Sequence, residues 1–261
     1  MSRAAKGTSS AMSDFNNGYS RPIPSTGEMA VDAGLRRFML GVYNKMALGL
    51  VLSGALAFAT SSIEPVRDLL FRVTGDGRLA GYTGLGSLIA FAPLAIILFS
   101  SFFMRGVSER TAGIYYWTIV ALVGASLGTV GLLYTGASVA SMFFITAAAF
   151  GGLSLVGYAT KKDLSGMRAF LVMGAWGLLV ALLVNAFLLQ SGGMLMILSA
   201  VGVLIFAGLI AAETQQLKTT YYQVGGDAAA LGVATNLGAL NLYLSFVNLF
   251  RFLLILFGQR R

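Results

Sequence analysis

Cysteine and histidine are both absent from the 261-residue sequence. Their absence excludes disulfides, thiolate nucleophiles, imidazole general bases and zinc sites built from His and Cys. Charged residues are also scarce, since Asp, Glu, Lys and Arg make up 11% of the chain, against about 25% in an average soluble domain. Because 57% of the residues are apolar, we expect most of the molecular surface to face lipid instead of water.

The net charge of +8 does not indicate binding to nucleic acid. Lys and Arg lie between long apolar runs and form no single basic patch. Basic residues that flank apolar segments are the usual pattern of a membrane protein. The bilayer is therefore the expected partner, and no nucleic-acid partner is expected.

Five segments contain no charged residue. A helix needs about 20 apolar residues to cross the hydrocarbon core, so the two longest segments have room for two spans each. Turn residues divide both of them, at Tyr134-Thr135-Gly136 and at Gln190-Ser191-Gly192-Gly193. The sequence thus predicts an all-α membrane protein with seven transmembrane helices, the first of which begins before Lys45. The five segments are residues 46–63, 79–104, 111–160, 169–212 and 228–250.

Residues 1–35 contain two of the four prolines and show no apolar periodicity. This composition predicts a disordered tail ahead of a transmembrane domain at residues 36–261. Basic residues concentrate on one side of the predicted membrane, which places the tail and the N-terminus in the cytoplasm. Of the 18 Lys and Arg residues, 12 lie in residues 1–45, 104–111, 160–168 and 213–236.

Glu213 lies where an unbroken helical pattern carries a carboxylate into the sixth predicted span. An ionisable group inside a span costs free energy, which makes it a candidate functional residue. The alternative is a carboxylate that is solvated at the end of its helix. Arg105 follows the second span on the same predicted side, where it either pairs with Glu213 or flanks the span as an ordinary cytoplasmic residue.

Asn241, Ser245 and Asn248 form a polar stripe on the last predicted span. Their spacing of i, i+4 and i+7 places them on one helical face, and Arg251 continues the stripe three residues later. A polar stripe in hydrocarbon has to face other helices or water. The stripe is therefore either a hydrogen-bonding seam between helices or the lining of an ion path.

Intramembrane catalysis has little support in this sequence. Serine and zinc proteases of the membrane need histidine, which this chain lacks. An aspartyl protease needs two intramembrane aspartates, and no predicted span contains an aspartate. We expect the chain not to be an enzyme and to need no cofactor.

Four stretches resemble the Bax inhibitor-1 family, in particular its bacterial membrane branch. The resemblance implies seven helices, with the last helix central in a ring of the other six. It also implies one of three roles: a pH-sensitive calcium leak, a modulator of cell death in eukaryotes, or a partner of membrane-bound proteolysis in bacteria. The stretches are Val42–Gly49, Tyr134–Ser138 with Phe144–Ala148, Gly157–Tyr158 with Lys161–Met167, and Gly238–Phe250.

Two positions depart from the family pattern that this resemblance implies. Glu213 stands where the sixth helix usually has aspartate, and Ser245 stands where the seventh helix usually has a second one. The pair of carboxylates that shares protons and senses pH is thus reduced to one acid. Calcium prefers six to eight oxygen ligands, so Glu213 with the polar stripe is expected to bind calcium weakly at best.

Two functions remain open on this basis. The first is a weak calcium or cation leak with a reduced carboxylate site. The second is a non-conducting regulator that binds other membrane proteins, such as a quality-control protease. The bacterial likeness implies a bacterial inner membrane in either case.

Overall fold

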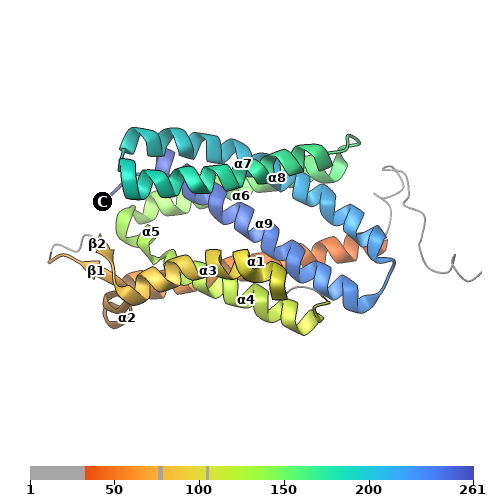
Figure 1. Ribbon diagram of the computed structural model, residues 1–261, viewed down its shortest axis with the longest axis horizontal. Coiled ribbons are helices and arrows are strands. Elements are labelled where there is room, and N and C mark those ends of the chain that lie inside the picture. The colour runs from red at the N-terminus through yellow and green to blue at the C-terminus, as the bar shows by residue number, and fades with distance from the viewer. Residues whose placement is uncertain (1–32, 76–78, 104–105) are drawn as a thin grey trace, which may run out of the picture.

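The computed structural model describes residues 33–75, 79–103 and 106–261, which form a helical bundle with one small hairpin (Figure 1). The first helix begins at Ala33, so residues 33–35 of the predicted tail belong to it, and the rest of that tail lies outside the described residues. The elements are α1 Ala33–Ser62, α2 Glu64–Leu70, β1 Phe71–Val73, β2 Leu79–Tyr82, α3 Gly84–Phe103, α4 Glu109–Ser126, α5 Gly128–Leu133, α6 Gly136–Ala159, α7 Ser165–Val184, a π-helical turn Asn185–Leu189, α8 Gly192–Val224 and α9 Ala228–Phe257.

Side-chain caps begin five of these helices. A cap oxygen accepts a hydrogen bond from one of the free N–H groups of the first turn, which leaves that donor satisfied. Both predicted turns are confirmed, because a helix ends and another begins around each of them. The capping residues are Thr83 of α3, Ser108 of α4, Thr135 of α6, Ser191 of α8 and Asp227 of α9.

Six helical spans within the described residues are long and apolar enough to cross a membrane. They make the chain a multi-pass membrane protein, with one span fewer than the seven predicted. The remaining predicted span corresponds to α3, whose apolar part, Gly84–Ser100, is shorter. α1 begins well before Lys45, as the sequence predicts. The six are α1, α4 with α5, α6, α7 with its π-helical turn, α8 and α9.

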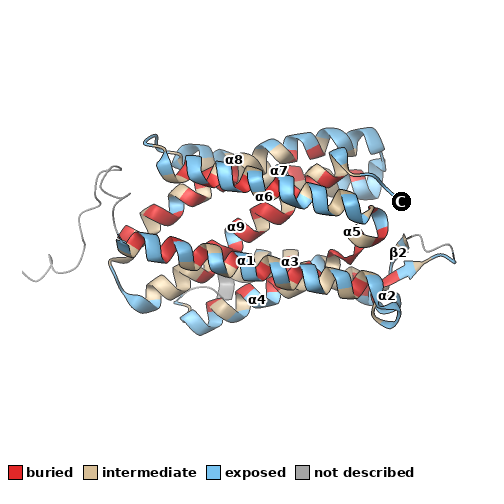
Figure 2. Cartoon of the chain, turned by 180° about the vertical axis from the view of Figure 1, so that it is seen from behind, coloured by how far each residue is buried: buried red, intermediate tan, exposed pale blue. Residues whose placement is uncertain are grey.

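α9 runs diagonally between two groups of helices (Figure 1). α1, α3 and α4 lie on one side of it, and α6, α7 and α8 lie on the other. It packs against α1, α4, α6 and α8. In its most apolar stretch 61% of the residues are buried, against 39% or less in the other five spans. Buried residues accordingly follow α9 through the middle of the molecule (Figure 2).

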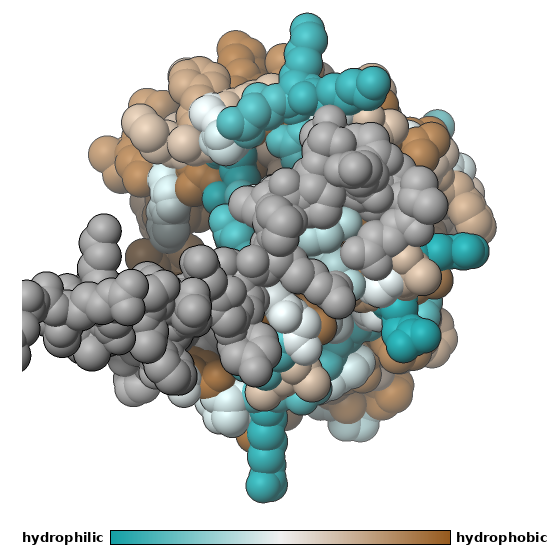
Figure 3. Space-filling view, turned by 90° about the vertical axis from the view of Figure 1, so that its right-hand side faces the viewer, coloured by the Kyte–Doolittle hydropathy of each residue, from teal (hydrophilic) through white to brown (hydrophobic). Residues whose placement is uncertain are grey.

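The outside of the bundle carries large apolar side chains. Phe144, Phe170 and Leu204 each expose 70% or more of their surface, which suits contact with lipid and not with water. Figure 3 looks along the bundle from the end where α8 meets α9. Hydrophobic side chains surround its flanks, and hydrophilic side chains gather on the end that faces the viewer.

The connection between α1 and α3 contains more structure than the sequence predicts. The short helix α2 starts with Pro65 in its first turn, where the missing N–H costs no hydrogen bond. β1 and β2 then pair antiparallel, with Phe71 opposite Tyr82. These strands have three and four residues, too few for a pattern of alternating side chains to stand out in the sequence.

α6 and α8 approach each other closely at Gly157. A Cβ atom at this position would collide with the backbone carbonyl group of Ala211 on α8. A residue without a side chain therefore lets the two backbones touch, as small residues do at many transmembrane helix contacts. This contact fixes the depth of α8 beside α6, close to Glu213.

Replacing Gly157 by alanine should force α6 and α8 apart. We expect Gly157→Ala to lower the melting temperature in mild detergent by roughly 5 °C, the effect of about 1–2 kcal/mol of overpacking. Gly152→Ala on the same helix is the matched control, because a Cβ atom there meets nothing within 4 Å. Equal melting temperatures for the two variants would contradict the close contact.

Candidate functional site

α8 and α9 form an antiparallel pair around a tight connection. Gly225 and Gly226 join them with φ angles of 66° and 89°, a left-handed conformation that glycine adopts without steric cost. α8 has 33 residues and is therefore about 50 Å long, whereas the hydrocarbon core is about 30 Å thick. Part of α8 must extend beyond the hydrocarbon core, and Glu213 lies in the half that leads to the α8–α9 turn.

Glu213 and Ser245 meet across this helix pair. The Ser245 hydroxyl donates a hydrogen bond to Oε2 of Glu213 at 2.8 Å. Ser245 is only 2% exposed, and Glu213 is half-buried. A hydrogen bond to an ionised group contributes more than one between neutral groups. The two residues that stand at the family's paired acidic positions therefore meet, and their function stays a prediction.

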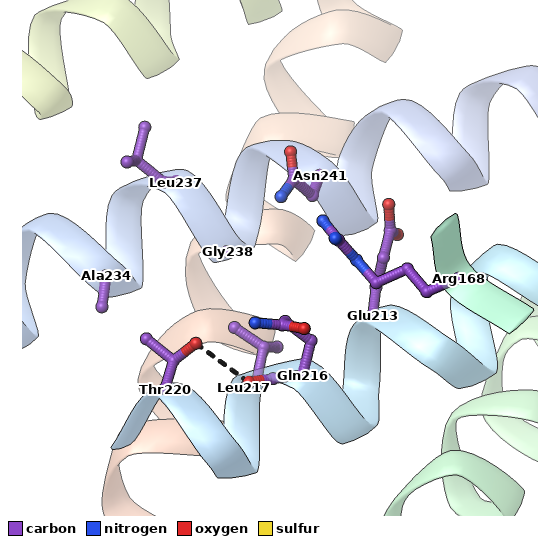
Figure 4. Close-up of a pocket in the computed structure, with 9 residues that line it drawn as sticks. All are labelled: Arg168, Glu213, Gln216, Leu217, Thr220, Ala234, Leu237, Gly238 and Asn241. Atoms are coloured by element: carbon purple, nitrogen blue, oxygen red, sulfur yellow. Dashed lines mark hydrogen bonds between the residues drawn. The ribbon is translucent and has the colours of Figure 1, made fainter. Parts of the chain in front are cut away.

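A cavity of about 230 Å³ opens beside Glu213, between α7, α8 and α9. Arg168 reaches into it from the first turn of α7, and Figure 4 shows its guanidinium group directed toward Asn241 and Glu213. The cavity therefore holds one negative and one positive side chain. Its lining consists of Arg168, Glu213, Gln216, Leu217, Thr220, Ala234, Leu237, Gly238 and Asn241.

The guanidinium group of Arg168 leaves one of its hydrogen-bond donors unpaired. Its Nε atom is buried and has no hydrogen-bond partner among the described residues. Within the described part of the chain the only ion pair is Arg67–Asp68 on α2, so Arg168 and Glu213 share the cavity without direct contact. The sequence left open whether Arg105 pairs with Glu213 or only flanks its span. Arg105 lies outside the described residues, and Arg168 is the arginine found beside the carboxylate.

The polar stripe of α9 is only partly an interior feature. Ser245 bonds to another helix, whereas the Asn248 amide donates to the Leu244 carbonyl of its own helix at 2.9 Å. Asn241 and Arg251 are exposed, and Asn241 also lines the Glu213 cavity. The stripe is therefore not a continuous seam between helices, and its role in an ion path stays a prediction. Helical spacing gives a common face, but it does not determine which positions on that face are covered by a neighbouring helix.

Residues 35–261 match the family described as Inhibitor of apoptosis-promoting Bax1. The chain belongs to the Bax inhibitor-1 family. The match leaves out only the first 34 residues, so it includes every helix described above and both partners of the Glu213–Ser245 bond. The family resemblance that the four sequence stretches indicate is thereby confirmed.

Bacterial relatives cover nearly the whole chain. An uncharacterized protein of Caulobacter vibrioides is 62% identical over 251 residues, which are 96% of this chain and 100% of the relative. The uncharacterized protein RP147 of Rickettsia prowazekii is 41% identical over 93% of this chain and 98% of its own length. The inner membrane protein YbhL of Escherichia coli is 38% identical, with 88% and 94% covered.

One polar residue of this Bax inhibitor-1 protein fixes the loop between α6 and α7. Gln215 accepts a hydrogen bond from the Leu164 amide and donates one to the Lys162 carbonyl, both at 2.7 Å. The sequence analysis missed this role, although a continuous helix past Glu213 places Gln215 near the loop. By fixing the start of α7, Gln215 also fixes where Arg168 enters the cavity.

Hydroxyl groups connect the helices around the site. Tyr43 on α1 bonds to Ser154 on α6 at 2.5 Å, and Ser154 bonds to Thr214 on α8 at 3.0 Å. Ser53 on α1 bonds to Tyr243 on α9 at 2.6 Å. These bonds tie both groups of helices together and hold α8 and α9 in the register that brings Glu213 to Ser245.

Removing the Gln215 side chain should loosen the α6–α7 loop without unfolding the bundle. We expect Gln215→Ala to speed hydrogen exchange at the Leu164 amide roughly tenfold, because that donor loses its acceptor. Gln216→Ala is the control, since Gln216 is exposed and follows directly on the same helix. Unchanged exchange at Leu164 in Gln215→Ala would show that the loop is held by other contacts.

Proposed function

We propose that this protein is a weak cation leak of the Bax inhibitor-1 type, with calcium as its cargo, and that the structure represents its closed state. The observation that carries the proposal is the Glu213–Ser245 bond beside the cavity. Within the described residues, Glu213 is the only acidic side chain more than one turn inside a candidate span. Such a group is costly in a membrane and is retained where it meets ions or protons.

Calcium fits this cavity as a passing ion and not as a tightly bound one. Oxygen donors on the lining are the Glu213 carboxylate, the Asn241 and Gln216 amides and the Thr220 hydroxyl. A calcium site uses six to eight oxygens and usually several carboxylates. Within the described residues there is no cluster of three or more acidic side chains that would hold a metal ion. Arg168 adds a positive charge to the same space, which opposes cation entry.

For the membrane arrangement we propose that α3 is the seventh span, with α9 at the centre of the other six. The 20 residues of α3 are about 30 Å long, which is the thickness of the hydrocarbon core. The basic residues at the α8–α9 end support a cytoplasmic N-terminus. The relative YbhL is an inner membrane protein, which supports the same address for this chain.

Glu213 and Ser245 provide a direct test of the leak. Purified protein in calcium-loaded liposomes should release calcium slowly, and Glu213→Gln should lower that rate roughly tenfold by removing the attracting charge. Ser245→Asp should raise the rate and make it depend on pH, because two adjacent carboxylates share protons. Glu109→Gln, the same change at the exposed first residue of α4, should leave the rate unchanged.

Two outcomes of that experiment would contradict the proposal. Release no faster than from protein-free liposomes at two pH values would exclude a leak. Strong pH-dependent release that Ser245→Asp leaves unchanged would place the gate elsewhere in the protein.

The proposed orientation has its own measurement. Fusions ending at residue 164 should activate a reporter that works only in the cytoplasm, and fusions ending at residue 192 should activate one that works only outside. The first position is in the α6–α7 loop and the second at the start of α8, so they lie on opposite membrane faces. The reverse pattern at both positions would overturn the N-inside orientation.

The second candidate is a non-conducting regulator that binds membrane proteins such as a quality-control protease. One observation favours it: the single carboxylate of the cavity is already bonded to Ser245 and faces Arg168. Absence of flux together with co-purification of a membrane protease would support this role. We also propose that the chain is not an enzyme, because it has no His or Cys and the described lining of the Glu213 cavity contains no second acid.

A further inference from the structure

A groove of about 550 Å³ runs between α1 and α6, apart from the Glu213 cavity. Tyr43 crosses its floor, with its ring edge-on to Phe150 at 6.4 Å between centroids and its hydroxyl bonded to Ser154. In Figure 2 α9 is visible between α6 and α1. The two helices that border the groove are thus joined by side chains and leave a hollow between their backbones.

The groove is open toward lipid and mostly apolar. Leu40 on α1 and Leu155 on α6 border it and are 51% and 67% exposed. Gly151 widens it, because a Cβ atom there would meet nothing within 4 Å. The polar groups on its floor, Tyr43 and Ser154, bond to each other. An apolar chain can therefore lie along the groove without leaving a buried hydroxyl unpaired.

The polar end of the groove lies at the membrane edge. Arg36, in the first turn of α1, and Tyr158, in the last turn of α6, line the same end. Gly151 lies about two turns deeper toward the bilayer centre. Lys218 adds a second positive charge behind this end, with its Nζ 4.8 Å from the centre of the Tyr158 ring. The positive end of the groove complements a negatively charged lipid headgroup, and its apolar part complements an acyl chain.

We propose that this groove binds one anionic phospholipid, with the phosphate at Arg36 and an acyl chain along Gly151 and Leu155. Basic residues at the ends of transmembrane helices attract acidic headgroups. Burial of the chain adds favourable free energy where it fills the hollow. The proposal does not depend on ion conduction, since none of these side chains lines the Glu213 cavity.

The test is native mass spectrometry of the full chain in mild detergent, after incubation with equal amounts of phosphatidylglycerol and phosphatidylcholine. Arg36→Gln should lower the retained phosphatidylglycerol about fivefold, the effect expected for one basic residue near a headgroup. Arg37→Gln is the matched control, because it removes the same charge from the neighbouring exposed residue outside the groove. Retained phosphatidylcholine should be low in both variants.

A second pair of variants tests the acyl-chain end. Gly151→Leu fills the groove and should release the bound lipid, whereas Gly152→Leu places the same side chain on the same helix outside the groove. Equal phosphatidylglycerol retention in Arg36→Gln and Arg37→Gln would overturn the proposal, as would equal retention of the two lipids by the natural protein. Both arginines are exposed, so the first pair stays informative if a leucine variant unfolds.

Discussion

A polar group in hydrocarbon has no water to bond with, so its partner has to come from its own backbone or from another helix. The arrangement of this bundle depends on that constraint. Two hydroxyls of α9 are bonded to other helices, Tyr243 to Ser53 on α1 and Ser245 to Glu213 on α8. α9 is therefore joined to both groups of helices, and its diagonal course through the most buried part of the molecule follows from these partners.

The approximate positions of the six spans could be predicted because they follow from local properties of the chain. A charged side chain is costly in lipid wherever it occurs. Charge-free segments therefore predict the spans without any information about how the helices pack. Turn residues at Tyr134 and Gln190 divided the long segments for the same reason. The hairpin around Phe71 could not be predicted in this way, because its strands are too short to show an alternation of polar and apolar residues. They form because they pair with each other.

The candidate site could be predicted only in part, because side-chain exposure depends on helix packing. The antiparallel course of α8 and α9 follows from the chain order, which was enough to bring Ser245 to Glu213. Arg168 lies 45 residues before Glu213 and shares its cavity only because α7 packs on α8. The spacing of residues along the sequence does not predict this helix contact. Asn241 shares a helical face with Ser245 but is exposed to the cavity, which helical spacing alone does not predict.

Arg168 affects the charge of the cavity in which we propose the leak. A pair of acids attracts a divalent cation strongly, whereas one acid and one guanidinium give a cavity without net charge. Two unit charges about 6 Å apart interact by about 3 kcal/mol at an effective dielectric constant of 20, and a divalent ion doubles that repulsion. In the leak that we propose, the positive charge of Arg168 therefore opposes a calcium ion at Glu213. Arg168 lies in the first turn of α7, next to the loop that Gln215 holds, so the proposed leak requires movement at the start of α7.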